Sequence, residues 1–129
     1  MHRLCTIIAL NYLPQAIALV DSTREVHPNI EFYVLITDAT QREQPNLSNA
    51  QILLPEDLDI SEDWLSEMRS YYDTVEFATS LKPFLLSTLL TPSVSTVTFL
   101  DPDILLFSEL TQGFAAVIYN KFTHVNRQN

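Results

Sequence analysis

Short apolar runs alternate with amphipathic stretches along the chain. Residues 4–10 and 30–37 are short, partly β-branched and not cleanly alternating, a pattern typical of strands buried on both faces of a sheet. Between them, residues 13–20 carry apolar side chains at helical spacing, with Pro14 in a first turn and His27-Pro28 as the stop. The pattern predicts a strand, a helix and a second, parallel strand joined by a right-handed crossover.

The next part of the chain predicts a loop, a short strand and a helix. Residues 39–50 are polar and predict a surface loop, and residues 51–54 are a short strand candidate. Ser61, followed by two acidic residues, predicts a helix start. The apolar stripe after it contains Trp64, Leu65, Met68, Tyr71 and Tyr72. We expect this aromatic stripe to pack in the core rather than to form a stacking platform.

A second helical stripe leads to the last predicted strand. The stripe contains Phe77, Leu81, Leu85 and Leu89. Pro83 interrupts it and cannot donate to the Thr79 carbonyl, which predicts a kink or a fresh helix start. Residues 97–100 predict a buried strand, and residues 104–107 predict a short extended piece.

This alternation of strands and helices predicts an α/β fold: a three-layer α/β/α sandwich around a mostly parallel sheet. The 129 residues are enough for one ordinary domain. We expect residues 1–110 to contain the sheet and residues 111–129 to be a tail of uncertain structure. Because the predicted sheet stops shortly after its fourth strand, we expect the fold to be incomplete.

Charge and glycine content exclude several kinds of partner. With 16 acidic and 7 basic side chains the formal net charge is −9, and no basic block interleaves with aromatics, which argues against nucleic acid as a partner. The sequence contains a single glycine, Gly113. A Walker loop and a dinucleotide-binding turn each need several glycines, so neither can form here. Binding of a phosphorylated small molecule therefore requires a metal ion and side chains.

The cysteine content and the lengths of the apolar runs bear on the compartment. The sequence contains a single cysteine, Cys5, which excludes a disulfide within the chain. Because Cys5 lies in an apolar run, we expect its thiol to be buried and structural. The run at residues 4–10 lacks the length and flanks of a signal peptide, and no run approaches the roughly 18 apolar residues of a membrane span. We expect a soluble cytoplasmic chain with no transmembrane segment, and peripheral membrane contact stays open.

The strongest chemical signal follows the fourth predicted strand. Asp101 and Asp103 stand one residue apart at its carboxyl end, where open α/β sheets hold ligands, and Pro102 fixes a φ angle between them. Paired carboxylate oxygens suit Mg²⁺ or Mn²⁺. Taken alone, the same three residues are also compatible with a plain Asp-Pro turn.

Three motifs carry a family resemblance through their order and spacing. They are Thr6-Ile-Ile-Ala-Leu-Asn-Tyr12, Phe77-Ala-Thr-Ser-Leu-Lys-Pro83 and Phe99-Leu-Asp-Pro-Asp-Ile-Leu105. Over residues 4 to about 110 the chain resembles the amino-terminal half of a GT-A glycosyltransferase, similar to family 8 and related nucleotide-sugar transferases. The resemblance implies a GT-A-type fold, a nucleotide-diphospho-sugar donor, Mn²⁺ or Mg²⁺, and hexosyl transfer to an acceptor that the sequence does not identify.

The resemblance also implies roles for individual residues. Asp101 and Asp103 match the metal-binding motif, and Asp101 also faces the ribose. Ala9 and Asn11 match positions that line the nucleoside pocket, and Asp38 lies where the second strand reaches the same edge. For two of these positions a structural role is the alternative: Asn11 as a helix cap and Asp38 as a turn residue.

Thr79 and Lys82 match the helix that faces the sugar-phosphate region of such enzymes, and Lys82 supplies a cation to the diphosphate. The alternative for Lys82 is a solvated surface charge. The half of the family's fold that provides the catalytic side chain and the acceptor contacts has no counterpart here, so no catalytic residue is assigned.

Two other functions compete with donor binding. A non-catalytic α/β interaction module, or a self-associating remnant, is favoured by an unpaired sheet edge and uncovered apolar surface, which imply a homo-oligomer or a completing chain. A phosphatase with an aspartate nucleophile also contains Asp-x-Asp. It requires the motif after the first strand, with Thr or Val two residues beyond the second aspartate, where this chain has Leu105 and a late motif.

Overall fold

The strands form a single sheet in the order β3-β2-β1-β4-β5. The computed structural model describes residues 1–40, 47, 50–102 and 117–120. The strands are β1 (His2–Ile8), β2 (Glu31–Ile36), β3 (Gln51–Leu53), β4 (Thr96–Phe99) and β5 (Val117–Asn120). Strands β1 to β4 run parallel, and β5 pairs antiparallel with β4. The predicted, mostly parallel sheet is confirmed.

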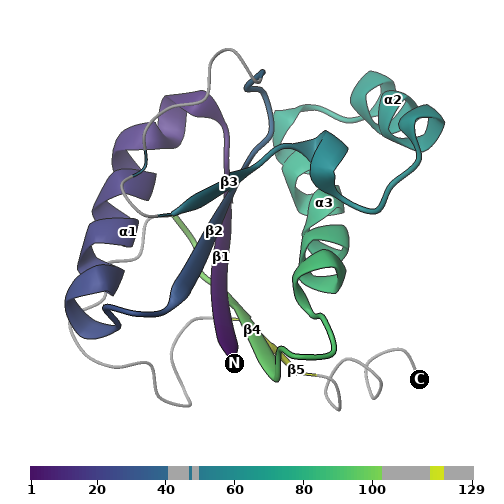
Figure 1. Ribbon diagram of the computed structural model, residues 1–129. Coiled ribbons are helices and arrows are strands. Elements are labelled where there is room, and N and C mark those ends of the chain that lie inside the picture. The colour runs from purple at the N-terminus through teal and green to yellow at the C-terminus, as the bar shows by residue number, and fades with distance from the viewer. Residues whose placement is uncertain (41–46, 48–49, 103–116, 121–129) are drawn as a thin grey trace.

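Helices cover both faces of this sheet. The helices are α1 (Leu13–Val26), α2 (Glu62–Tyr71) and α3 (Thr74–Leu89). Figure 1 shows α1 on one face and α3 on the other, with α2 beyond α3. The three-layer α/β/α arrangement expected from the sequence is therefore present. No helix in the described part of the chain is long and apolar enough to cross a membrane.

The central strands are buried on both faces, which explains why they are apolar without alternation. In β1, Leu4 and Ile8 pack with α1, whereas Cys5 and Ile7 pack with α3 on the opposite face. The same division holds along β2, and all of these side chains are at most 8% exposed. The two faces of the sheet thus carry separate core clusters, one closed by α1 and the other by α3 together with the inner face of α2.

Local signals in the sequence define where α2 and α3 begin. The Ser61 hydroxyl accepts a hydrogen bond from the Trp64 backbone N–H at 3.2 Å, as its N-cap position predicts. Asp73 and Glu76 form a reciprocal capping box, in which each side chain accepts from the other residue's backbone N–H, at 2.8 and 3.1 Å. The second cap ends α2 and starts α3 in a new direction.

The aromatic stripe of α2 is a correction to the sequence analysis. Leu65 and Met68 are buried as expected, but Trp64 is 52% exposed, Tyr71 82% and Tyr72 44%. The helix lies at the margin of its layer, beyond α3 (Figure 1), so only its inner face reaches the core. The spacing identified an amphipathic helix, but it did not show that only a narrow face of the helix, with Leu65 and Met68, packs against the rest of the protein.

Pro83 does not start a new helix, because α3 is continuous from Thr74 to Leu89. The proline ring is exposed, while Leu81 and Leu85 on the opposite face are fully buried. Packing of that face holds the helix together across the missing hydrogen bond.

The carboxyl-terminal segment contributes a strand that the sequence analysis did not assign. Strand β5 pairs Val117 with Phe99 and Asn120 with Thr96, and therefore extends the sheet beyond β4. The extended piece expected at residues 104–107 lies outside the described residues.

Candidate functional site

The topology creates a switch point between β1 and β4. The chain leaves β1 through α1 toward β2 on one side, and reaches β4 from α3 on the other. The Leu100 backbone N–H donates to the Cys5 carbonyl at 2.9 Å, which keeps the end of β4 alongside β1, whose own carboxyl end at Ile8 lies farther along the edge. In open α/β sheets, ligands bind in the crevice at this position.

Three of the candidates from the sequence, Ala9, Asn11 and Asp101, follow β1 or β4 near this switch point. Ala9 continues the extended backbone of β1, and a 3₁₀ turn at Leu10–Tyr12 presents Asn11 to solvent. Asp101 lies two residues after Phe99, the end of β4, and is exposed. Neither the Asn11 nor the Asp101 side chain forms a hydrogen bond or ion pair with another described residue. Asp103 lies outside the described residues.

Asp38 reaches the same edge from β2 and has a defined structural contact. Its Oδ1 accepts a hydrogen bond from the Leu10 backbone N–H at 2.8 Å, and the Thr37 backbone N–H donates to the Ile8 carbonyl at 2.9 Å. The turn after β1 is therefore anchored to the end of β2. One carboxylate oxygen is occupied in this way, while the residue itself stays exposed.

Lys82 lies beneath β4 rather than extending freely into solvent. Its Nζ is 4.1 Å from the centroid of the Phe99 ring, a cation–π contact, and the residue is half-buried. Phe99 precedes Asp101 by two positions, so the contact brings a positive charge close to the carboxyl edge. The Thr79 hydroxyl instead donates to the Val75 carbonyl of its own helix at 2.9 Å.

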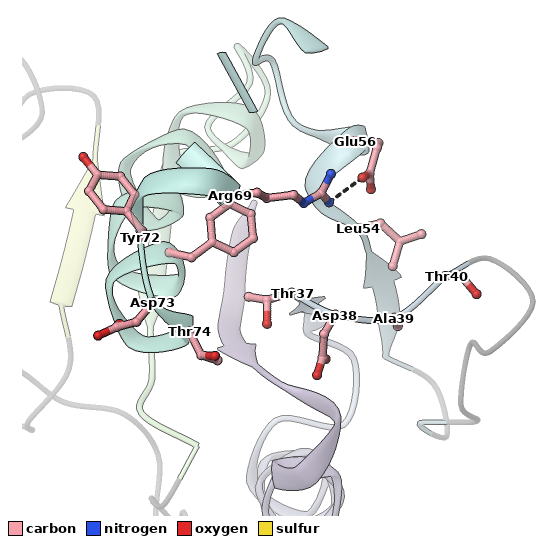
Figure 2. A pocket seen from close by; sticks show the side chains of 11 residues that line it. Thr37, Asp38, Ala39, Thr40, Leu54, Glu56, Arg69, Tyr72, Asp73 and Thr74 are labelled. Carbon is pink, nitrogen blue, oxygen red and sulfur yellow. Dashed lines mark hydrogen bonds and ion pairs between the residues drawn. The ribbon is translucent and has the colours of Figure 1, made fainter. Parts of the chain in front are cut away.

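A cleft of about 670 Å³ opens beside this edge, at the corner between the sheet and the helices α2 and α3 (Figure 2). Its lining combines the ends of β2 and β3 with the end of α2 and the start of α3. The lining residues are Thr37, Asp38, Ala39, Thr40, Leu54, Glu56, Arg69, Tyr72, Asp73, Thr74 and Phe77. Asp38 alone among them was a candidate from the sequence.

An ion pair spans one wall of the cleft. Arg69 Nη2 lies 2.5 Å from Glu56 Oε1, and the Arg69 guanidinium lies 5.6 Å from the centroid of the Phe77 ring. Partial burial is the largest single effect and raises the pKa of Glu56, but the hydrogen bond from Arg69, a backbone hydrogen bond and the Arg69 charge together outweigh it and lower the pKa of that carboxyl. The positive charge in the cleft is thus already paired with a carboxylate.

Sequence reasoning missed most of this lining for an identifiable reason. Glu56 and Arg69 are 13 residues apart and come together only because the chain turns back between β3 and α2. The Asp73–Glu76 capping box was readable as a helix start, yet it does not indicate that a cavity lies beside it.

The donor chemistry at the switch point fits a metal ion that is shared with a phosphorylated ligand. Mg²⁺ is commonly held by one or two carboxylates together with substrate phosphates and water. Asp101 offers carboxylate oxygens without a described partner, whereas no group of three or more His, Cys, Asp or Glu side chains in the described ranges could enclose an ion alone.

Comparisons with known proteins bear on the fold. No protein-family model matches the chain, and no curated protein matches it. The chain is similar to the structure of the galactosyltransferase LgtC in complex with donor and acceptor sugar analogues, with a TM-score of 0.55 and 18% identity. An active-site mutant of LgtC gives a TM-score of 0.56 and 16% identity. Each match covers 84% of this chain and 40% of the LgtC chain.

At these identities the similarity establishes architecture and no more. The chain spans 40% of the length of the LgtC structures, and this part contains the parallel sheet and its flanking helices. The chain therefore has a GT-A-like α/β fold over the region that it shares with LgtC.

Proposed function

We propose that the chain binds a metal-nucleotide-diphospho-sugar at the β1–β4 switch point, as the donor-binding half of a GT-A-type glycosyltransferase. One observation carries the proposal: the carboxyl end of β4 is hydrogen-bonded to the neighbouring strand β1, and an exposed carboxylate, Asp101, follows two residues after Phe99. The similarity to a galactosyltransferase of the same architecture supports it.

Different residues at the edge contact different parts of the donor. Ala9 and Asn11 contact the nucleoside, and the Asp38 carboxylate keeps their turn in place through Leu10. Asp101 binds the metal and faces the ribose, together with Asp103 from the same sequence motif.

Charge distribution explains how an acidic chain holds a diphosphate. A divalent ion bound with the donor neutralises the diphosphate and stabilises the negative charge that develops as the sugar–phosphate bond breaks. Lys82, held over the Phe99 ring below the edge, adds a cation of the chain's own. Thr79 lies one helical turn earlier and faces the sugar-phosphate region.

A thermal-shift titration of the 129-residue chain tests the proposal. UDP, GDP, ADP and dTDP are each added with and without Mn²⁺. A ligand at 100 times its Kd stabilises the fold by about 2.7 kcal/mol, which gives a clear shift. We expect a metal-dependent shift for one nucleotide that is lost in the Asp101→Asn/Asp103→Asn variant.

Two further variants sharpen the test. Asp21→Asn removes an exposed carboxylate from α1, away from the edge, and should leave the shift unchanged. Lys82→Met keeps an unbranched apolar stem over Phe99 and removes the charge, so it should weaken diphosphate binding. A cooperative unfolding transition with no nucleotide-dependent shift, or a shift that survives in the double variant, would refute donor binding at this edge.

A non-catalytic interaction module is the second candidate, and one observation favours it. Large apolar side chains are exposed on adjoining helices: Trp64 at 52%, Tyr71 at 82% and Val75 at 74%. Such surface is typical of a site that another chain covers. Size-exclusion chromatography at increasing protein concentration tests for self-association, and a monomer at every concentration would count against a second copy as that partner.

A further inference from the structure

A second hollow lies on the exposed face of α2, where that helix meets α3. Its volume is about 370 Å³, and its lining residues are Trp64, Glu67, Met68, Tyr71, Tyr72 and Glu76. The first four recur at helical spacing on one face of α2, and the last two come from the junction with α3. Met68 is buried, whereas all three aromatic side chains are exposed. We call this surface the α2 groove.

The charged side chains of the α2 groove are acidic. Glu67 and Glu76 are both exposed, and none of the described residues that line the groove is basic. Glu76 Oε1 accepts the Asp73 backbone N–H at 3.1 Å, which holds this carboxylate at the start of α3. The Glu67 side chain forms no hydrogen bond or ion pair with another described residue. The groove therefore presents two carboxylates beside three aromatic rings.

This combination of groups recognises an organic cation. The face of an aromatic ring attracts an ammonium or guanidinium group, and a nearby carboxylate adds a charge-assisted hydrogen bond. The chain uses the same chemistry in the neighbouring cleft, where Arg69 lies 5.6 Å from the Phe77 ring centroid and 2.5 Å from Glu56 (Figure 2). There the cation belongs to the chain itself, whereas the rings and carboxylates of the α2 groove have no described cation of their own.

The exposure of the apolar side chains favours a protein partner over a small free cation. Tyr71 is 82% exposed, and the apolar surface continues onto α3 at Val75, which is 74% exposed. A single ammonium ion covers little of this surface. A polypeptide that carries apolar side chains beside its cation covers the rings and Val75 together, as is usual for exposed apolar patches that bind proteins.

Charge argues against three other occupants. Nucleic acid and the anionic surface of a membrane are repelled by Glu67, Glu76 and a formal net charge of −9. A second copy that met the groove with its own groove would place carboxylates against carboxylates. A partner that carries positive charge is complementary instead.

We propose that the α2 groove binds a basic amphipathic segment of another protein. A Lys or Arg side chain of the partner lies between the aromatic rings and the two carboxylates, and its apolar side chains cover Trp64 and Val75. This inference rests on the interaction surface named above as the second candidate function, to which it gives a partner chemistry. It does not depend on donor binding at the β1–β4 edge.

Trp64 is the single tryptophan of the chain, so its fluorescence reports directly on the α2 groove. The probe is a synthetic amphipathic peptide of lysine, leucine and alanine. Matched peptides replace lysine with glutamine, or contain the same residues in an order without an apolar face. We expect the amphipathic lysine peptide to bind and to move the Trp64 emission to shorter wavelength, because the partner covers the ring. Added NaCl should weaken this binding, since salt screens exposed charges.

Variants of the groove test its two kinds of group separately. Glu67→Gln/Glu76→Gln removes both charges and retains the helix cap, because a glutamine oxygen also accepts the Asp73 N–H. Tyr71→Ala removes an exposed ring and leaves the Trp64 reporter in place. Each variant should weaken binding of the lysine peptide about tenfold or more, with unfolding in urea close to that of the parent chain.

Glu25→Gln and Ile17→Ala are the matched controls. Both replace an exposed side chain of α1, on the opposite face of the sheet, and should bind the peptide as the parent chain does. The proposal is overturned if the lysine peptide does not bind, if the glutamine or reordered peptide binds equally well, or if the groove variants bind normally. Tetramethylammonium binding as tightly as the peptide would also overturn it, in favour of a small cation.

Two further measurements separate this inference from the proposed functions. Size-exclusion chromatography that reveals a dimer, which Tyr71→Ala dissociates, keeps the interaction surface but makes its occupant a second copy and overturns the basic partner. The Mn²⁺-dependent nucleotide shift should be the same in the parent chain and in every groove variant. Its absence from the parent chain refutes the donor site and leaves peptide binding at the α2 groove intact.

Discussion

The Asp38 carboxylate accepts a 2.8 Å hydrogen bond from the backbone N–H of Leu10, 28 residues earlier in the chain. This contact joins the end of β2 to the turn after β1, and it fixes the backbone on which Asn11 stands. Asp38 is thus a positioning residue at the proposed donor edge as well as part of the neighbouring cleft wall.

Replacing Asp38 with alanine should destabilise the fold by about 1 kcal/mol, because the Leu10 N–H loses its acceptor. Asp38→Asn retains an amide oxygen at the same place and should lose less. Urea unfolding monitored by circular dichroism gives both values. Equal stability of the alanine variant and the parent chain would show that the contact does not hold the turn.

Burial rather than residue type should decide the cost of removing valine methyl groups. Val97 in β4 is 0% exposed, whereas Val75 in α3 is 74% exposed. Val97→Ala should lower the free energy of unfolding by roughly 2 kcal/mol, through lost apolar burial and a cavity. Val75→Ala should leave it unchanged or raise it slightly, since alanine has the higher helix propensity. Urea unfolding of both variants at one pH provides the comparison.

The pH dependence of stability should include a contribution from Glu31. The hydrogen bond from Arg3 Nε, 2.7 Å from Oε2, lowers the pKa of Glu31 below its ordinary value of 4.5, and the Tyr33 hydroxyl at 3.0 Å acts in the same direction. A lowered pKa in the folded state stabilises the fold above the unfolded pKa. That stabilisation is lost as the pH falls through the folded pKa.

Glu31→Gln isolates this contribution. The difference in unfolding free energy between parent and variant should be constant near neutral pH and should shrink as the pH falls below about 4.5. Urea unfolding over that range measures the difference, and Glu25→Gln on α1 controls for the loss of an exposed carboxylate. A difference that grows toward acid pH would contradict the assignment.

Cys5 should be unreactive in the native protein. Burial raises the pKa of its thiol to about 12, against a smaller opposing effect of the Lys82 charge. At pH 8 the reaction with an aromatic disulfide reagent should therefore be slow in buffer and fast in concentrated urea, where the thiol is exposed. Rapid labelling under native conditions would mean that the core around β1 opens readily.

Local chemistry was sufficient for most of the elements. Apolar runs without alternation predicted β1, β2 and β4 because strands buried on both faces contain few polar positions. The Pro14 and Ser61 signals identified the first turn of α1 and the cap of α2 because each depends on neighbours only a few residues away.

The proposed donor edge was also partly readable from sequence. Ala9, Asp38 and Asp101 each follow a strand, and parallel strands bring their carboxyl ends to one edge. Whether these residues bind a donor is still a prediction.

The sequence by itself determined the chain order of β1 to β4 and of the helices, the burial of the central strands, and the position of Asp38 and Asp101 after their strands. Only the tertiary structure decided that Trp64 and Tyr71 face solvent, that Glu56 reaches Arg69, and that β5 extends the sheet. The physical reason is the distance along the chain over which each kind of interaction acts. Periodicity and caps act within a few turns of chain, whereas exposure, ion pairs and clefts depend on which distant segment packs alongside.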